Sequence, residues 1–301
     1  MIELKNEKIA IPVVLFAGLL WSFGPLVVRY MDEPGAAPWQ YIFARGLTIF
    51  VVLNLYLFFE EGKNFVKNYL KIGISGLIGG CGLGIAMITF IYSITNTSAA
   101  ITLLCLAAMP FFTALLGFLF LKEKISLNVW LAIIIATIGL VIIAFGNTEK
   151  SSLIGLIFGM ASSIGFSIFS VTLRWRKETP KFTTVAVAGL FCVIVALTFI
   201  AVGELTILST SYNGALFSLH GVIVCMGLIL YSIGSKAIPA AELTLLSLTE
   251  VIGGIFWVWL PIFGINEVPT PNTIIGGFFL FMSIIYYSLT IKSNRRFIAL
   301  N

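Results

Sequence analysis

One acidic residue inside a long apolar run is the sharpest candidate for chemistry in this sequence. Glu250 lies about halfway along the run 241–262. If that run spans a bilayer, an ionised carboxylate there costs at least ~2.5 kcal/mol. At helical spacing Glu250 shares a face with Ser247, Gly254 and Trp257. Removal from water favours the neutral form of a carboxyl group, so Glu250 is a candidate proton carrier or an anchor for a substrate amine. The alternative is a protonated or hydrogen-bonded residue that packs against another helix.

A basic residue, Arg45, lies a few residues inside a second apolar run, 38–58. Its planar guanidinium group could receive a substrate carboxylate through two parallel hydrogen bonds. Alternatively, the side chain could extend to a polar interface or pair with backbone carbonyl groups. If Arg45 and Glu250 faced the same cavity, the two charges would suit a zwitterion.

Prolines inside two apolar runs predict kinks of the kind that serve as gates. Trp21 and Ser22 lie near the middle of the first run, shortly before Gly24 and Pro25. Pro110 has an equivalent position in the fourth run. Proline removes a backbone hydrogen bond and bends a helix. We therefore predict that Gly24, Pro25 and Pro110 form gates or kinks, and that Trp21 and Ser22 contact substrate.

Other aromatic and small polar side chains are candidates for the lining of a binding site. Aromatic rings can hold a cation or a flat ligand, although at 14% of the chain they also serve general packing. The predicted substrate contacts of this kind are Phe112, Ser163, Phe166, Tyr231, Ser247 and Trp257. The single histidine, His220, lies near the end of its run, and we interpret it as a hydrogen-bonded surface group, with a proton relay as the alternative.

The sequence contains no pattern typical of a catalytic or metal site. Its four cysteines are far apart and lack CxxC spacing, which indicates small buried side chains rather than a zinc or redox site. The stretch 73–76 reads GISG, like a nucleophile motif of intramembrane proteases, but the predicted topology puts Ser75 and His220 near opposite membrane faces. No GxxxxGK[ST] motif occurs. We therefore expect no enzyme activity, no cofactor, no use of ATP and no nucleic-acid partner.

The composition places these residues on membrane-spanning helices. Hydrophobic residues make up 59% of the chain and charged residues 10%, whereas a soluble protein has roughly a quarter of its residues charged. About 20 apolar residues cross the ~30 Å hydrocarbon layer as a helix, and such runs are too long for barrel strands. We predict an all-α integral membrane protein with ten transmembrane helices and no cleaved signal peptide, the spans being 9–29, 38–58, 71–93, 98–120, 127–145, 152–173, 183–203, 215–234, 241–262 and 272–291.

The basic residues predict the orientation of these spans. Arg29 and Lys150 fall on one side and Arg45 lies within a span, so the remaining fifteen of the 18 Lys and Arg residues fall on the other side. Basic residues concentrate in cytoplasmic loops. We therefore predict a multi-pass protein of the bacterial cytoplasmic (inner) membrane with both termini in the cytoplasm.

An internal repeat divides the chain into two halves. The segment 98–128 echoes the segment 240–272, with small, leucine-rich and aromatic stretches in the same order. Each half then contains five predicted spans, an odd number, so the halves must insert with opposite orientation. Inverted repeats place a binding site between them near the middle of the bilayer and permit two access states.

These residues resemble the drug/metabolite transporter superfamily, in particular its EamA-type members with two tandem five-helix units. The resemblance implies repeats at 9–146 and 152–291, with spans 1, 3, 4, 6, 8 and 9 around a central cavity and spans 5 and 10 as braces. One departure concerns the ninth span, where Val251 follows Glu250 and the family often has proline. The segments that carry the resemblance are LLWSFGPLVVRY (19–30), FARGLTIF (43–50), SAAITLL (98–104), LTLLSLTEVIGGIFWVWLPIFG (243–264) and TPNTIIGGFFLF (270–281).

Together, the residues and the resemblance predict a secondary transporter that works by alternating access, coupled to protons or another gradient. The first substrate hypothesis is an amino acid or related zwitterion, and a small organic cation such as a quaternary amine is the alternative. A channel would need a continuous polar stripe through many helices, which the sequence lacks, and an intramembrane enzyme is the remaining alternative. The expected partners are the small-molecule substrate and the lipid bilayer, with the protein as a monomer or homodimer.

Overall fold

The computed structural model describes residues 6–32, 38–97, 99–145, 153–176, 178–208, 210–265 and 268–298. Every regular element in these ranges is helical, which confirms the predicted all-α class. Three residues of the Lys and Arg count that predicts the orientation, Lys5, Lys150 and Lys177, lie outside the described residues. Positions 98, 146 and 152, which bound predicted spans or repeats, also lie outside them. The elements are α1 (Glu7–Trp21), α2 (Gly24–Tyr30), α3 (Pro38–Glu61), η1 (Gly62–Phe65), α4 (Val66–Lys71), α5 (Gly73–Asn96), α6 (Ala99–Leu106), α7 (Met109–Leu116), η2 (Gly117–Leu121), α8 (Leu127–Phe145), α9 (Leu153–Trp175), α10 (Lys181–Val202), α11 (Ser211–Gly234), α12 (Ala240–Ser247), α13 (Thr249–Trp259), η4 (Pro261–Phe263) and α14 (Pro271–Ile298).

Seven helical stretches in the described part of the chain are long and apolar enough to cross a membrane: Lys8–Tyr30, Pro38–Lys71, Gly73–Asn96, Leu153–Trp175, Lys181–Val202, Ser211–Gly234 and Ala240–Trp259. The positions of the other three predicted spans hold shorter apolar helices, Met109–Leu121, Leu127–Gly139 and Pro271–Tyr287. The structure therefore supports a multi-pass membrane protein. The count of ten spans and the side on which the termini lie stay predictions.

Three of the predicted spans are each built from two helices. The first breaks between α1 and α2 at Ser22 and Phe23, and the fourth breaks between α6 and α7. Pro25 and Pro110 lie in the first turns of α2 and α7, where the missing N–H group of proline costs no hydrogen bond.

The ninth span breaks at Leu248, between α12 and α13, without a proline. The amide of Leu248 donates to the carbonyl of Leu245 at 3.2 Å, which tightens the last turn. The hydroxyl of Ser247 donates to the carbonyl of Thr244 at 2.8 Å and competes with the regular backbone bonding. The ninth span is therefore discontinuous even though Val251 occupies the place where the family often has proline.

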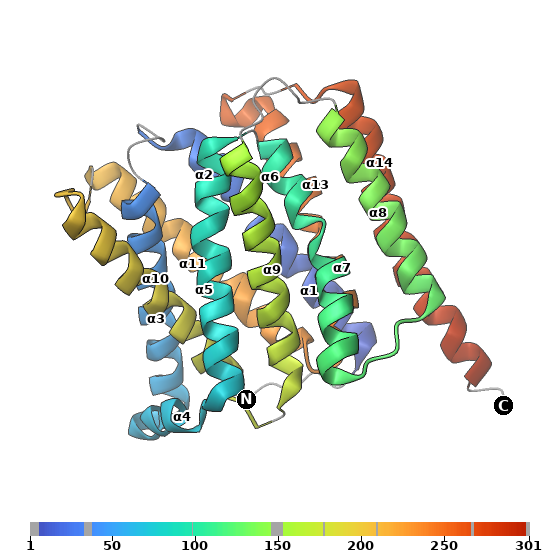
Figure 1. Ribbon diagram of the computed structural model, residues 1–301, viewed down its shortest axis with the longest axis horizontal. Coiled ribbons are helices and arrows are strands. Elements are labelled where there is room, and N and C mark those ends of the chain that lie inside the picture. The colour runs from blue at the N-terminus through green and yellow to red at the C-terminus, as the bar shows by residue number, and fades with distance from the viewer. Residues whose placement is uncertain are drawn as a thin grey trace.

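Helices of the first half pair with helices of the second half throughout the molecule. The pairs are α1 with α11, α3 with α10, α5 with α9, α7 with α12 and α8 with α14. Figure 1 shows α8 and α14 side by side at one edge of the molecule, with α3 and α10 toward the opposite edge. The core therefore lies at the interface between the two halves of the chain.

The backbones of α5 and α9 meet at a pair of glycines. A Cβ atom on Gly165 would lie 2.6 Å from the carbonyl oxygen of Gly82, and one on Gly82 would lie 3.0 Å from the carbonyl oxygen of Gly165. Small residues allow helices to approach this closely in lipid, where dispersion contacts hold helices together. This contact sets the distance between two of the helices that enclose the central cavity.

Candidate functional site

A cavity lies at the centre of the bundle, where the two halves meet. The six spans that were expected to line a cavity all contribute to its wall, through α1, α2, α5, α6, α7, α9, α11 and α13. Helix α3 also contributes, through Arg45. Most of the lining is apolar. The lining residues are Trp21, Gly24, Arg45, Leu83, Ala86, Met87, Phe90, Leu106, Met109, Ser162, Phe166, His220, Val224, Leu228 and Glu250.

The helix breaks of all three discontinuous spans lie at this cavity. Gly24 begins α2, Met109 begins α7, and Glu250 lies in the first turn of α13; all three line the cavity. The first amide groups of a helix have no partner within that helix and carry a partial positive charge. Glu250 therefore occupies a helix position that favours a carboxylate. Its side chain is partly exposed on the cavity wall.

Arg45 faces the same cavity from α3, with 3% of its surface exposed. Its Nη2 atom donates to the carbonyl oxygen of Met87 at 2.8 Å, and its guanidinium carbon lies 5.3 Å from the centre of the Tyr41 ring. Among the described residues its Nε atom is buried without a hydrogen-bond partner. Arg45 thus pairs with a backbone carbonyl, as one of the two sequence alternatives has it, and it lines the cavity that contains Glu250; its contact with a substrate carboxylate stays a prediction.

Aromatic side chains form one part of the wall. The Nε1 atom of Trp21 donates to the carbonyl oxygen of Val224 at 3.2 Å, and the Trp21 ring meets Phe166 edge-on at 5.5 Å between ring centres. Tyr231 packs behind these two rings, and its hydroxyl lies 2.7 Å from the hydroxyl of Ser170. Tyr231 is therefore a support for the aromatic wall and lies outside the cavity lining.

Several predicted contact residues lie outside the cavity lining, and most of them bond to other parts of the protein. Ser22 accepts a hydrogen bond from Nε1 of Trp257 at 2.6 Å, which ties α13 to the break between α1 and α2. Ser163 donates to the carbonyl oxygen of Cys105, and Ser247 bonds within α12. Phe112 also lies outside the lining. Substrate contact by these residues in another conformation stays a prediction.

The histidine has a different place from the one inferred from its run. We expected His220 near a membrane face, but it is 2% exposed and lines the central cavity. The reason is that α11 begins at Ser211, several residues before the predicted start of the eighth span. The sequence did hold a signal for this position. His220 lies nine positions after Ser211 in a 24-residue apolar helix, and polar residues inside such helices usually face a cavity.

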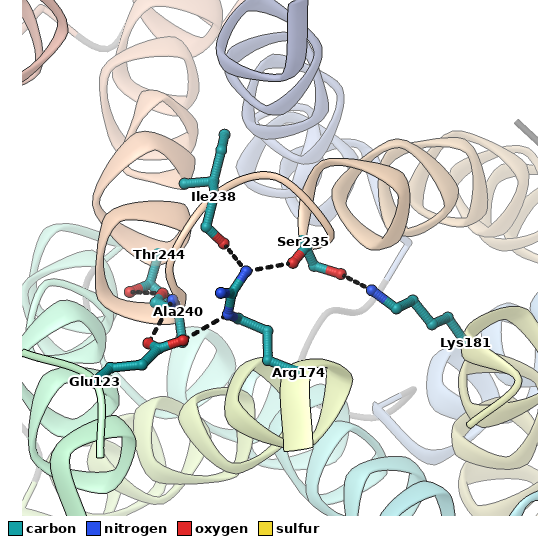
Figure 2. Close-up of polar contacts among 7 residues, drawn as sticks. All are labelled: Glu123, Arg174, Lys181, Ser235, Ile238, Ala240 and Thr244. Carbon is teal, nitrogen blue, oxygen red and sulfur yellow. Dashed lines mark hydrogen bonds and ion pairs between the residues drawn. The ribbon is translucent and has the colours of Figure 1, made fainter. Parts of the chain in front are cut away.

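A polar network closes one end of the bundle (Figure 2). Arg174 extends from α9 to the loop between α11 and α12, where Nη1 donates to the carbonyl oxygens of Ser235 and Ile238 at 2.9 and 2.7 Å. Its Nε atom forms an ion pair with Glu123 at 2.6 Å. The other carboxylate oxygen of Glu123 accepts from the amide of Ala240 at 3.2 Å, at the start of α12. We call this network of Glu123, Arg174 and the 235–240 loop the basic-face latch, because the charge count predicts it on the side that carries most of the basic residues.

At the opposite end, side chains of Asn213 and Tyr30 are among the described groups that bridge neighbouring elements. The side chain of Asn213 in α11 exchanges two bonds with the backbone of Asp32, each 3.1 Å long. The hydroxyl of Tyr30 donates to the carbonyl oxygen of Phe263, and the Phe23 and Trp257 rings stack with centres 4.9 Å apart. In the part of the chain that the structure describes, no group of three His, Cys, Asp or Glu side chains could hold a metal ion.

Comparison with known proteins agrees with this architecture. Residues 8–145 match the EamA-like transporter family. The first half of the chain is therefore similar to this family. This match confirms the family resemblance seen in the sequence motifs.

Two curated relatives carry names that indicate transport. An "Uncharacterized transporter" of Helicobacter pylori (strain J99) is 28% identical to this protein over 162 residues, 54% of this chain and 52% of that protein. The aligned part thus spans about half the length of this relative. A "Pseudopaline exporter CntI" of Pseudomonas aeruginosa (strain UCBPP-PA14) is 24% identical over 221 residues, 72% of this chain and 75% of that protein.

A solved structure shares the fold of this protein over nearly its whole length. The solved structure, titled "Crystal structure of protein", superposes with a TM-score of 0.73. The superposition covers 96% of this chain and 99% of the chain in that structure. The two sequences are 16% identical, so the likeness concerns the fold alone.

Proposed function

We propose that this protein is a secondary transporter that carries a small zwitterion, such as an amino acid or a related metabolite, across the membrane by alternating access. The observation that carries the proposal is the presence of Arg45 and Glu250 on the wall of one central cavity. A carboxylate suits the guanidinium of Arg45, and an ammonium group suits the carboxylate of Glu250. The apolar and aromatic residues between them suit the carbon skeleton of such a substrate.

The broken helices support movement as part of this function. Discontinuous helices around a midplane site are typical of transporters in which one part of the bundle rocks against the other. Helix pairs such as α5 with α9 and α3 with α10 join the two halves of the chain, and the predicted repeats 9–146 and 152–291 are the natural rocking bodies. The basic-face latch and the Asn213 contacts would then close the two ends of the path in turn. The relative named as a pseudopaline exporter favours export as the direction.

Counterflow in proteoliposomes tests the proposal. Vesicles that contain the purified protein are loaded with one member of a panel of amino acids, quaternary amines or nucleobases, and uptake of the labelled compound is followed. A zwitterion carrier gives saturable uptake of amino acids that is stimulated by the same compound inside. Arg45→Ala provides a control of similar fold, in which this uptake should fall.

Other outcomes would replace the proposal with one of its alternatives. Saturable exchange of quaternary amines alone would show an organic-cation carrier that uses the rings of Trp21 and Phe166, although Arg45 in the same cavity disfavours a cation. Flux that rises linearly with concentration and shows no counterflow would indicate a channel. No exchange of any compound by folded protein would contradict the zwitterion proposal.

A further inference from the structure

His220 forms part of the cavity wall next to Arg45 and carries a buried nitrogen that the protein leaves unpaired. Its Nδ1 atom is hydrogen-bonded to the hydroxyl of Tyr41. Its Nε2 atom is buried and has no hydrogen-bond partner in the described part of the chain. Because buried polar atoms are normally paired, this nitrogen is open to a partner other than the described side chains and backbone.

Tyr41 holds the imidazole ring and selects the nitrogen that carries the proton. Its ring lies fully buried between Arg45, whose guanidinium carbon is 5.3 Å from the ring centre, and His220, whose ring centre is 5.8 Å away. Arginine offers only hydrogen-bond donors, so the phenol oxygen faces a cation and its own proton is directed to Nδ1. A neutral imidazole that accepts at Nδ1 donates at Nε2. His220 therefore presents an N–H group.

Arg45 adds a second unpaired donor on the same wall. One of its terminal nitrogens is held by the carbonyl oxygen of Met87 at 2.8 Å, whereas Nε is buried and unpartnered among the described residues. Two N–H donors beside a full positive charge match a carboxylate, which has two acceptor oxygens and forms its strongest hydrogen bonds with charged donors.

The start of α2 covers the free nitrogen of His220. A Cβ atom built on Gly24 would lie 3.9 Å from Nε2, and Gly24 follows directly on the break between α1 and α2. A small movement of α2 about this break would open Nε2 to the cavity. The break thus links access to this nitrogen with the conformation of the first span.

We propose that His220 is a specificity-determining residue that donates from Nε2 to the carboxylate of the substrate beside Arg45, with Tyr41 as its positioning residue. This inference rests on the proposed function for its substrate class, since Glu250 receives the ammonium group there. It adds that the protein discriminates between an acid and the corresponding amine through His220.

Ligand binding to the full chain in detergent tests the inference without any membrane gradient. Thermal unfolding is measured with three sets of compounds: amino acids, the amines that lack the carboxylate, and the acids that lack the amino group. Carboxylate-bearing compounds should stabilise the wild-type protein more than the matching amines. His220→Phe should weaken binding of the carboxylate compounds about tenfold, the loss of one hydrogen bond to a charged group, and leave amine binding unchanged.

Three further variants separate recognition from a merely structural role. In His220→Gln the amide nitrogen can take the place of Nε2, so this variant should restore most of the selectivity, whereas His220→Asn, whose amide ends at the level of Nδ1, should not. As a single change, Tyr41→Phe should weaken carboxylate binding. Combined with His220→Phe, it should cause no further weakening. The Gln and Asn variants decide the question if His220→Phe fails to fold.

Either of two results would overturn the inference: equal weakening of acid and amine binding in His220→Phe, or no stabilisation of the wild-type protein by any carboxylate compound. The proposed transport function can be refuted independently of this inference. Protein that binds carboxylates selectively through His220 but exchanges no solute in vesicles would refute transport and leave the anchor in place.

Discussion

Arg45 and Glu250 are the two charged side chains on the cavity wall within the described residues. They come from helices far apart in the sequence, α3 and α13. Each could be singled out from its apolar run, because a charge in a membrane span is costly and usually has a functional partner. That both face one cavity could not be read from the runs, since this depends on the rotation of each helix about its own axis.

Glu250→Gln should abolish uphill, gradient-driven uptake while exchange of substrate across the membrane persists. Glutamine keeps the shape of the side chain and a carbonyl oxygen that can accept from the substrate's ammonium group, but it cannot release a proton, so weakened exchange remains while proton coupling is lost. The measurement is accumulation under an imposed pH gradient, compared with counterflow in the same vesicles. Glu242→Gln is a matched control in the same span, because Glu242 pairs with Tyr287 of α14 and does not line the cavity. Unchanged accumulation in Glu250→Gln would exclude the coupling role.

At the level of elements, the helix breaks lie on the cavity wall, and we expect the loops beside them to open and close its ends. The breaks at Pro25 and Pro110 follow from local chemistry, and the sequence indicated both. The break at Leu248 depends on hydroxyl groups that bond within α12, a signal weaker than proline. The basic-face latch was not predicted, because Glu123, Arg174 and the 235–240 loop are separated in the sequence and meet only when α9, α11 and α12 pack.

Breaking the basic-face latch should open the cavity toward the side that the charge count assigns to the cytoplasm. In Arg174→Gln the carbonyl oxygens of Ser235 and Ile238 lose a charged donor, so the closed arrangement loses stability relative to the open one. The measurement is the labelling rate of Leu228→Cys, a position on the cavity wall, by a membrane-impermeant maleimide in a background without native cysteines. Labelling from the basic face should become faster.

Charge exchange provides the control for this prediction. Glu123→Arg alone should also speed labelling, and the combination with Arg174→Glu should bring the rate back toward that of the intact pair. Lys63→Gln removes an exposed positive charge in η1 and should leave the rate unchanged. If labelling were equally slow in all of these variants, the network would be a structural contact without a gating role.

At the level of the whole molecule, stability depends on close contact between the two halves. Lipid offers little hydrophobic drive for helices to associate, so packing of small residues supplies much of the attraction. The contact of Gly82 with Gly165 joins α5 of the first half to α9 of the second. The apolar surface around it could be predicted from composition, whereas the choice of partner helix could not.

Gly165→Ala should destabilise the fold by about 1–3 kcal/mol, because the added methyl group would meet the carbonyl oxygen of Gly82 and the helices would have to separate. Gly277→Ala is the matched control, since a Cβ atom there has no neighbour within 4 Å. This control should be neutral or more stable by up to about 1 kcal/mol, because alanine loses less conformational entropy in a helix. The midpoint of thermal unfolding in detergent compares the two variants, and an equal midpoint would contradict the proposed packing role.

The sequence by itself determined the all-helical membrane class, the family, most helix positions and two of the three helix breaks. These features follow from local properties: apolar length, proline and the cost of charge in hydrocarbon. Only the tertiary structure decided that His220 lies on the cavity wall, that Ser22, Ser163 and Ser247 bond between or within helices, and that Arg174 joins three elements. The physical reason is that helix rotation and pairing are set by side-chain packing between distant segments, which periodicity within one segment does not contain.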